Sequence, residues 1–309
     1  MKKSIIFPGQ GAQKVGMGKD LYENFAIAKE VFQEVNDALK ISLSEIIFVD
    51  EDKTLNHTVN TQPAIMTVGV AIFRVLEKEF GLKINYFDYC AGHSLGEYTA
   101  LVCSGSLKLA EAATILRARG IAMQSAVKIG EGAMAAVLGA EINEINQIII
   151  QNNFSTVEIS NDNCPGQIVI SGKKNEIDNC CIKIKENLSK KSISLPVSAP
   201  FHCKLMKPAA DNMKDLILNS NLKKPEIPIV SNVTVKEEIN EEIIKNLLVE
   251  QIYSRVRWRE IIEFMIKSNV SEIYELGPGK SLSAMIKRFD TNITLQNFNS
   301  IEEIIKYNK

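Results

Sequence analysis

The apolar residues of the first part of the chain alternate between short runs and longer helical patterns. Residues 4–7 form an apolar run ended by Pro8 and Gly9, which predicts a short buried strand. One helical stripe follows, formed by Leu21, Phe25, Ala28, Phe32, Val35 and Leu39. Strands that alternate with helices in this way predict a parallel sheet with helices on both faces.

The same alternation continues up to residue 127. A second helical pattern opens with Thr61-Gln62-Pro63, and we expect the proline in the first turn, where a missing N–H is tolerated. An apolar run over residues 86–91 predicts the next strand, and a further helix is predicted over about 107–127.

The order of elements changes after Gly130. The pattern predicts a strand at 133–138, a helix at 141–151, strands at 157–160 and 167–170, a helix at 175–188 and a strand at 192–197. Residues 161–166, between the two middle strands, are dense in turn formers and predict a loop. This βαββαβ order is that of a ferredoxin-like unit.

The first pattern resumes at about Pro200, with a helix from Lys207, a strand at 227–230, a helix from Arg259 and a strand at 273–276. We therefore predict an α/β domain formed by residues 1–127 and 200–309, with a ferredoxin-like domain inserted at 128–199. A cleft between the two is the expected ligand site.

Composition narrows the function classes. The 309 residues carry a net charge of -1, which argues against an extended nucleic-acid surface. We expect no apolar stretch long enough to span a membrane, and the apolar run near the N-terminus is too short for a signal peptide. The six cysteines show no Cys-x-x-Cys spacing, so no zinc site is predicted and a reducing cytoplasm is expected.

The segment Gly92-His93-Ser94-Leu95-Gly96 lies between a predicted strand and a helical pattern. In this setting Gly-x-Ser-x-Gly indicates a nucleophile elbow, a sharp turn that presents the serine hydroxyl. The glycines permit the turn, and the backbone N–H of Leu95 is placed to bind a developing oxyanion. The bare motif also arises by chance, with Ser94 then an ordinary turn or N-cap serine. The flanking strand and helix favour the catalytic interpretation.

A serine nucleophile needs a base within hydrogen-bond reach, and the chain has three histidines. His93 adjoins the serine but leaves the elbow in another direction, and His57 lies in a polar stretch that predicts a solvated loop. Elimination makes His202 the candidate base, against the alternative of a structural histidine. No acidic residue stands out as its orienting partner, so a backbone carbonyl is expected there.

Arg119 is the candidate anion-binding residue. It shares a helix face with Ala112, Leu116 and Met123, and a guanidinium on an apolar face needs an anionic partner such as a carboxylate. The alternative is an arginine whose stem follows the apolar stripe while its charge reaches water. Arg117 faces elsewhere and is expected to be a surface charge.

Eight short motifs occur in order along the chain, and together they closely resemble the malonyl-CoA:acyl carrier protein transacylases of type II fatty-acid synthases. The resemblance covers essentially the whole chain, and it implies an α/β-hydrolase-like core with a ferredoxin-like insert. The motifs are Phe7-Pro8-Gly9-Gln10-Gly11-Ala12-Gln13, Thr61-Gln62-Pro63-Ala64, Gly92-His93-Ser94-Leu95-Gly96-Glu97-Tyr98, Arg119-Gly120, Asn161 with Pro165-Gly166-Gln167, Pro200-Phe201-His202, Leu205-Met206-Lys207-Pro208-Ala209 and Glu275-Leu276-Gly277-Pro278-Gly279.

The resemblance implies roles for the catalytic groups. Ser94 would be the nucleophile and His202 its general base and acid. The main-chain carbonyl of Gln251 would hold the imidazole. The backbone N–H groups of Gln10 and Leu95 would form the oxyanion hole.

The resemblance also implies roles in substrate binding. Arg119 would pair with the free carboxylate of the malonyl group, and Gln62 would lie beside it. Phe201 matches the malonyl-type pattern of related acyltransferase domains. Asn161 and Gln167 would belong to a hairpin of the insert that faces the cleft.

The implied reaction moves a malonyl group from malonyl-CoA to the phosphopantetheine thiol of acyl carrier protein, through a malonyl-serine ester, for fatty-acid biosynthesis. It requires no metal or redox cofactor, and the implied partners are malonyl-CoA and acyl carrier protein. We expect a cytoplasmic monomer without nucleic-acid or membrane partners, although the sequence itself does not give the oligomeric state. Two alternatives stay open: a serine hydrolase or thioesterase on the same core, and a non-catalytic scaffold that binds carrier protein.

Overall fold

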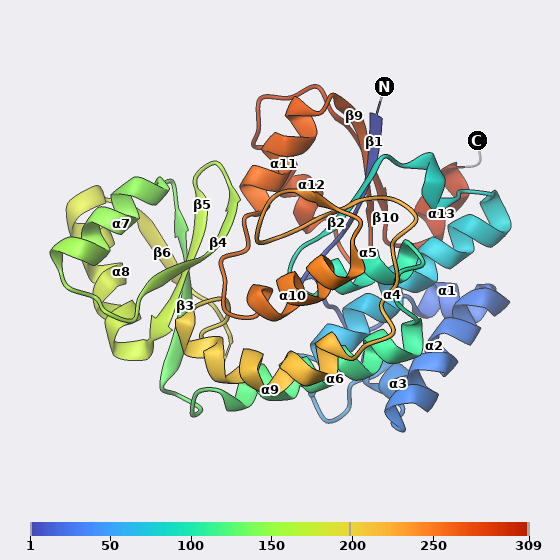
Figure 1. The fold of residues 1–309 in the computed structure, drawn as a ribbon, viewed down its shortest axis with the longest axis horizontal. Coiled ribbons are helices and arrows are strands. Elements are labelled where there is room, and N and C mark those ends of the chain that lie inside the picture. Colours follow the sequence, from blue (N-terminus) through green and yellow to red (C-terminus); the bar gives the residue numbers. More distant parts are fainter. Residues whose placement is uncertain (1, 198, 308–309) are drawn as a thin grey trace.

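The computed structural model describes residues 2–197 and 199–307, and within these ranges the chain forms a main sheet of six strands (Figure 1). The strands are β1 (Lys2–Phe7), β2 (Tyr89–Gly92), β7 (Ile229–Val230), β8 (Glu237–Glu238), β9 (Val270–Leu276) and β10 (Thr294–Phe298). Their order is β10-β9-β1-β2-β7-β8, and all neighbours are parallel except the antiparallel pair β7 and β8. The predicted parallel α/β sheet is confirmed.

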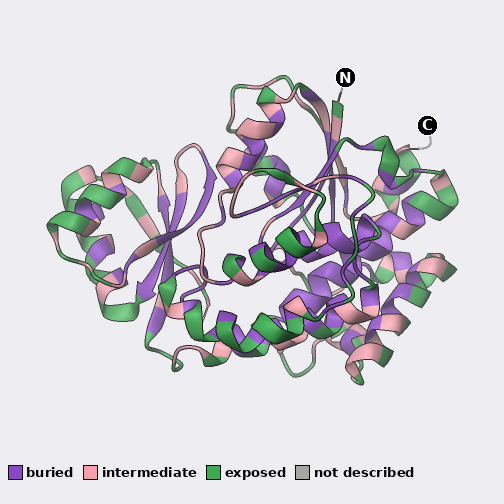
Figure 2. Cartoon of the chain, viewed as in Figure 1, coloured by how far each residue is buried: buried purple, intermediate pink, exposed green. Residues whose placement is uncertain are grey.

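Helices cover both faces of this sheet, as expected. Ile5 and Phe7 pack into one apolar core and Ile6 into a second on the opposite face, because successive strand side chains alternate. Figure 2 shows the strands and the inner sides of the helices buried. The first core includes α2 (Ala26–Leu39), α4 (Thr58–Phe80), α5 (Gly96–Cys103), α6 (Leu109–Ser125), α9 (Lys207–Leu218) and α10 (Glu241–Gln251), and the second includes α11 (Trp258–Lys267) and α12 (Ser281–Ile286).

A second sheet is formed by residues 132–194, between α6 and α9. Its strands are β3 (Gly132–Leu138), β4 (Glu158–Cys164), β5 (Gln167–Lys173) and β6 (Lys191–Ser194), antiparallel in the order β4-β5-β3-β6. Helices α7 (Ile142–Gln151) and α8 (Lys174–Leu188) cover one face, where Ala135 and Val137 are buried. Met134 and Ala136 alternate to the other face and pack with the main core. The predicted strand and helix order of this segment is confirmed.

The predicted single helix over residues 21–39 is wrong. The chain forms α1 (Lys19–Asn24) and α2, separated by Phe25 in an extended conformation with φ of -126°. The expected place of Pro63 is also wrong, because α4 already begins at Thr58 and the proline lies inside it. The remaining short helices are α3 (Leu43–Phe48), η1 (Ile84–Tyr86), η2 (Lys204–Met206) and α13 (Ile301–Tyr307).

Several strand predictions need correction at their ends; β7, for example, begins at Ile229 and β9 at Val270. Residues 161–164 belong to β4, so the predicted six-residue loop is a two-residue turn at Pro165 and Gly166. Tyr86 closes a 3-10 helix, and β2 begins only at Tyr89. The strand predicted at 192–197 is β6, which ends at Ser194. Residues 1, 198, 308 and 309 of the predicted domains lie outside the described residues.

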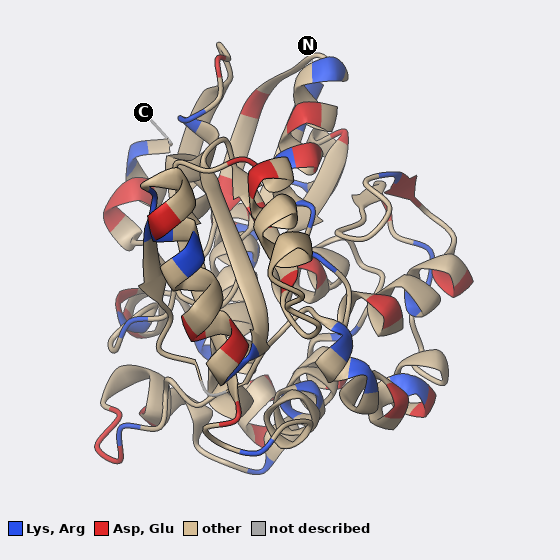
Figure 3. Ribbon diagram, turned by 90° about the vertical axis from the view of Figure 1, so that its left-hand side faces the viewer, with Lys and Arg blue, Asp and Glu red and all other residues tan. Residues whose placement is uncertain are grey.

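Helix α4 corrects one expectation about hydropathy. It is long and apolar enough to cross a membrane, with a mean hydropathy of 1.3 over its most apolar stretch, whereas we expected no such stretch. That stretch is 89% buried inside the protein, as in the core helix of a globular fold. In the ribbon of Figure 3, the segments coloured for acidic and for basic residues are interspersed along the helices and loops.

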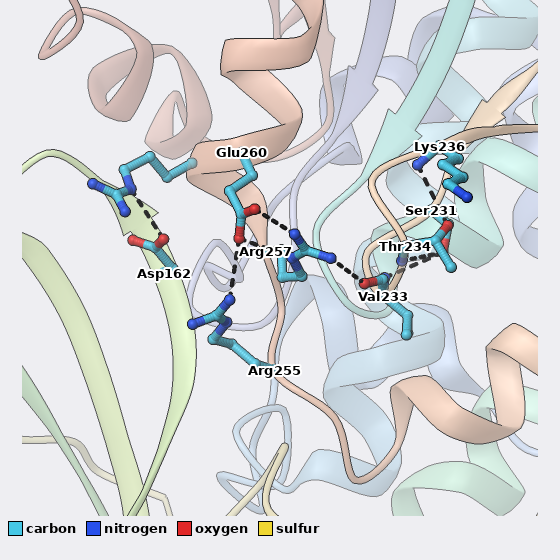
Figure 4. A network of polar contacts seen from close by, with 9 residues as sticks. Asp162, Ser231, Val233, Thr234, Lys236, Arg255, Arg257 and Glu260 are labelled. Atoms are coloured by element: carbon cyan, nitrogen blue, oxygen red, sulfur yellow. Dashed lines mark hydrogen bonds and ion pairs between the residues drawn. The ribbon is translucent and has the colours of Figure 1, made fainter. Parts of the chain in front are cut away.

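The small sheet is joined to the main sheet's elements along the outer edge of β4. The N–H of Val256 donates to the carbonyl of Ser160 (2.8 Å), and the N–H of Asp162 donates to the carbonyl of Val256 (2.9 Å). The Asp162 carboxylate also pairs with Arg259 Nε at 3.0 Å (Figure 4). This pairing explains why turn-forming residues here adopt a strand, and it fixes the segment that follows Gln251.

Candidate active site

Ser94 lies in a sharp turn between β2 and α5. Its backbone φ is 53°, a left-handed conformation that a non-glycine residue rarely adopts outside constrained sites. A Cβ on Gly92 would lie 1.9 Å from the carbonyl carbon of Gly96, and a Cβ on Gly96 would lie 2.3 Å from the carbonyl oxygen of Phe7. Both glycines are therefore required for the elbow predicted from the motif.

Asn232 holds this turn, and sequence reasoning missed it. Its Oδ1 accepts a hydrogen bond from the N–H of Ser94 (2.8 Å), and its Nδ2 donates to the carbonyl of Gly92 (2.7 Å). The side chain is fully buried. It follows β7 at the carboxyl end of the parallel sheet, where functional groups gather in such folds. That position was the signal available in the sequence.

His202 lies within hydrogen-bond reach of the serine. Its Nε2 is 2.8 Å from Ser94 Oγ, and its Nδ1 is 2.9 Å from the carbonyl oxygen of Gln251. Since a carbonyl can only accept, Nδ1 carries the proton and Nε2 is free to accept from the hydroxyl. Burial and the nearby Arg119 lower the pKa of His202 to about 3, so the imidazole is neutral near pH 7.

The other two histidines stand where elimination placed them. His93 Nε2 is 2.9 Å from Asn163 Oδ1, and the centroid of its ring lies 5.6 Å from that of Trp258. Burial lowers the pKa of His93 as well. His57 is exposed at the start of α4. Neither side chain forms a hydrogen bond with Ser94 among the described residues.

Arg119 lies beside the same hydroxyl, with only 1% of its surface exposed. Its Nη1 donates to Gln62 Oε1 (2.6 Å), and its Nη2 donates to Gln251 Oε1 (2.9 Å) and Ser94 Oγ (3.1 Å). These partners are all neutral, so the described residues leave a buried positive charge next to the serine. Burial lowers the pKa of Arg119, but an arginine remains charged at neutral pH. The site is therefore suited to a small anionic group.

Arg117 differs from its expected role as a surface charge. It is half-buried, and its Nη1 donates to Asn60 Oδ1 at 3.1 Å. It does not line the cavity described next.

A cavity of about 290 Å³ opens onto Ser94 between the two sheets. One wall, from the main sheet's elements and loops, includes the other predicted residues Gln10, Gln62, Leu95, Arg119, Phe201 and His202. The predicted residues Asn161 and Gln167 line it from the small sheet, whereas Gln251 lies behind it. Its apolar lining consists largely of Met123, Met134, Ala136, Val169, Leu195, Val197 and Met285.

Glu97 is a second buried residue to which sequence reasoning gave no role. Its Oε2 accepts from Gln251 Nε2 (2.8 Å) and from the N–H of Asn232 (3.2 Å). Burial raises the pKa of this carboxyl to about 7, partly offset by those two hydrogen bonds and by Arg119. Glu97 belongs to the elbow motif, but a single sequence does not show which way its side chain points.

Metal ligation was not predicted, and the described residues contain no group of three His, Cys, Asp or Glu side chains that could hold a metal ion. The six cysteines are free thiols, five of them buried. Burial raises the pKa of each thiol, which disfavours the thiolate form.

The chain is similar to known proteins over nearly its whole length. The family model described as the acyl transferase domain matches residues 5–288. The malonyl CoA-acyl carrier protein transacylase of Bacillus subtilis is 41% identical over 294 residues, covering 94% of this chain and 92% of that protein. The Staphylococcus aureus (strain MRSA252) protein of the same name is 38% identical, covering 100% and 99%.

Solved structures show the same fold. The acyl-carrier-protein S-malonyltransferase of Bartonella henselae superimposes with a TM-score of 0.95 at 42% identity, covering 99% of this chain and 98% of that one. A malonyl-transacylase solved in complex with its type II polyketide acyl-carrier protein gives a TM-score of 0.94 at 36% identity, with 99% and 98% covered. The chain belongs to the acyl transferase domain family, among the malonyl CoA-acyl carrier protein transacylases.

Proposed function

We propose that this protein transfers a malonyl group from malonyl-CoA to the phosphopantetheine thiol of acyl carrier protein, for fatty-acid biosynthesis. The observation that carries the proposal is the buried Arg119, whose guanidinium touches the hydroxyl of the Ser94–His202 pair. A cation at this position suits an acyl group that bears its own carboxylate. The names of the relatives support malonyl-CoA and carrier protein as the two substrates, and the structure of a relative bound to its carrier protein supports the partner.

The first half-reaction forms an ester on Ser94. His202 Nε2 takes the hydroxyl proton as Oγ bonds to the thioester carbonyl carbon. The N–H groups of Gln10 and Leu95 receive the negative charge on the carbonyl oxygen. The carbon–sulfur bond then breaks, and the imidazolium gives its proton to the coenzyme A thiolate.

The second half-reaction reverses these steps with a new thiol. The phosphopantetheine thiol gives its proton to His202, and its sulfur bonds to the ester carbon. The carbon–oxygen bond breaks, and the imidazolium returns the proton to Ser94 Oγ. The carbonyl of Gln251 keeps the ring in place through both proton transfers, which is why no third carboxylate is needed.

The residues that line the cavity support roles for the remaining substrate contacts. The malonyl carboxylate pairs with Arg119, and Gln62 fixes the guanidinium from its other side. Phe201 limits the width of the acyl pocket, and Asn161 and Gln167 reach the substrate from β4 and β5. The proposed chemistry uses these side chains, the backbone groups of Gln10, Leu95 and Gln251, and the two substrates, with no metal or redox cofactor.

We interpret residues 1–127 with 200–309 as an α/β-hydrolase-like catalytic domain and residues 128–199 as a ferredoxin-like insert. The parallel order of the main sheet and the βαββαβ order of the small one support this division. We further propose that the protein acts in the cytoplasm as a monomer.

The test offers purified protein several labelled acyl-CoAs with holo-acyl carrier protein as acceptor. The proposal expects label on the carrier thiol, with malonyl-CoA preferred over acetyl-CoA. Label lost mainly to water would indicate a hydrolase or thioesterase instead. Carrier binding without any covalent label on the protein would indicate a non-catalytic scaffold.

A further inference from the structure

A buried chain of hydrogen bonds links Arg119 to the carboxyl group of Glu97, near the start of α5. Arg119 Nη2 donates to Gln251 Oε1 (2.9 Å), and Gln251 Nε2 donates to Glu97 Oε2 (2.8 Å). All three side chains are 2% exposed or less. An arginine can only donate and an ionised carboxylate can only accept, so the amide of Gln251 has one favourable orientation between them.

The same glutamine also holds the groups that perform the chemistry. Its carbonyl accepts from His202 Nδ1 (2.9 Å), and its Nε2 also donates to the carbonyl of Ser94 (3.1 Å). Glu97 fixes that amide and, by accepting from the N–H of Asn232, braces the residue that holds the elbow. Through Gln251 and Asn232, the carboxyl group of Glu97 therefore supports the nucleophile Ser94, the base His202 and the guanidinium of Arg119.

The carboxyl group of Glu97 also affects the charge balance around Arg119. Removing a cation from water without an anion is costly, and the direct hydrogen-bond partners of Arg119 are neutral. The charged or titratable groups that interact with Glu97 among the described residues are Arg119 from α6 and Tyr98 beside it on α5. Glu97 is thus the acid that faces the buried cation, with one amide between them.

We propose that Glu97 is a positioning residue and the resting counter-charge of Arg119, and that it weakens the enzyme's hold on a carboxylated acyl group when ionised. The inference rests on the proposed function, since it assumes that Arg119 receives the substrate carboxylate. Two anions near one guanidinium repel each other, so binding of the malonyl group favours the protonated form of Glu97. The preference for malonyl over acetyl groups should then fall as the pH rises through neutrality.

The direction of this pH dependence follows from the titration of the Glu97 carboxyl. Burial raises the pKa of Glu97 to about 7, so it is mostly protonated at pH 6 and mostly ionised at pH 8. Malonyl-CoA should therefore show a KM that rises with pH relative to acetyl-CoA, which lacks the second carboxylate. Titration of His202 or of the coenzyme A phosphates affects both substrates alike and cancels in this ratio.

The experiment measures formation of the acyl-enzyme from malonyl-CoA and acetyl-CoA between pH 6 and pH 8. In the wild type we expect the malonyl-to-acetyl ratio of kcat/KM to fall by about threefold or more over this range. Glu97→Gln keeps an acceptor for Gln251 but no charge, so the ratio should become independent of pH. Glu97→Ala removes the acceptor, and we expect kcat to fall about tenfold or more for both substrates.

Glu250→Gln is the matched control, because this exposed carboxylate adjoins Gln251 in α10 and should leave the pH dependence unchanged. The inference is overturned if Glu97→Gln keeps the wild-type pH dependence, or if Glu97→Ala keeps the wild-type kcat. A wild type that forms no acyl-enzyme from malonyl-CoA would instead overturn the proposed function, so the two failures are distinguishable.

Discussion

The two walls of the cavity differ in the kind of side chain they supply. Behind Ser94, the elements of the main sheet contribute buried polar groups that are tied to one another, Arg119, Gln251, Glu97 and Asn232 among them. Opposite them, the small sheet and the segment that follows β6 contribute a mainly apolar lining, together with Asn161, Asn163 and Gln167. In the proposed mechanism, the elements of the main sheet supply the reacting groups, while the small sheet closes and shapes the site.

The difference also appears in how each wall is built. The polar wall is fixed by hydrogen bonds over long sequence separations, such as the 2.8 Å contact between Gln251 and Glu97. Each of these groups is buried, so losing one partner leaves another unsatisfied. The apolar wall relies on packing, which tolerates changes of shape better than a polar network tolerates a missing acceptor. Substitutions on the two walls should therefore differ in size and in kind.

The largest effect is expected for Ser94→Ala. The change removes the only hydroxyl within reach of His202 in the proposed mechanism and adds no bulk, so the fold should persist. Covalent labelling of the denatured protein by labelled malonyl-CoA should disappear. Label still attached to the variant after denaturation would show that another residue is the nucleophile.

Replacing His202 by alanine should slow both half-reactions by about 10²–10⁴, the usual scale for a general base. The same imidazole takes the serine proton and later the thiol proton, so rates of acylation and of transfer to carrier protein should fall together. His57→Ala is the control, because this exposed side chain lies away from the hydroxyl. A larger loss in His57→Ala than in His202→Ala would refute the assignment.

Arg119→Ala should change selectivity more than it changes the chemistry. Removing one member of a buried charge pair costs about 2–5 kcal/mol, or roughly 30-fold to several thousand-fold in malonyl transfer. Acetyl transfer should hold or rise, because an acetyl group has no carboxylate for the guanidinium to bind. Comparison of the two transfer rates checks this, with Arg117→Ala as the control. An unchanged ratio in Arg119→Ala would contradict recognition of the carboxylate.

The smallest effect is expected at the junction that carries the small sheet. Asp162→Asn keeps an acceptor for Arg259 but removes the charge. Burial raises the pKa of the Asp162 carboxyl, so the ionised form is already costly to hold there, and the partner Arg259 is partly exposed. The free energy of unfolding should therefore fall by only about 1 kcal/mol. Acyl-enzyme formation should stay within about threefold of the wild type. Urea unfolding measures the first quantity, with Asp178→Asn in the exposed Lys174–Asp178 pair as the control. A loss of activity on the scale of Arg119→Ala would show that the small sheet carries chemistry too.

The sequence predicted what short-range patterns can encode. Periodicity located the main helices and both sheets, and the spacing of Gly92, Ser94 and Gly96 located the elbow. His202 followed by elimination, because only three histidines had to be compared. These predictions rest on residues that are close together in the sequence, or on a comparison of only three histidines. They therefore do not depend on how distant segments pack.

The sequence did not reveal contacts that depend on tertiary packing. Asn232 meets Ser94 across 138 residues, and its place just after a predicted strand does not show which distant segment its side chain contacts. Asn161 and Asp162 are turn-forming residues, yet they extend β4 because its outer edge pairs with Val256. The break between α1 and α2 at Phe25 interrupts a stripe whose apolar spacing reads as continuous. In each case a tertiary contact or local geometry overrides the pattern.

The most direct test of the central claim is a chase of the isolated acyl-enzyme. Wild-type protein is labelled with malonyl-CoA, freed of excess substrate, and mixed rapidly with holo-acyl carrier protein. The account predicts that label leaves Ser94 for the carrier thiol at least as fast as the overall turnover. Label that stays on the protein, or passes to water before it reaches the carrier, would contradict transfer through a malonyl-serine ester.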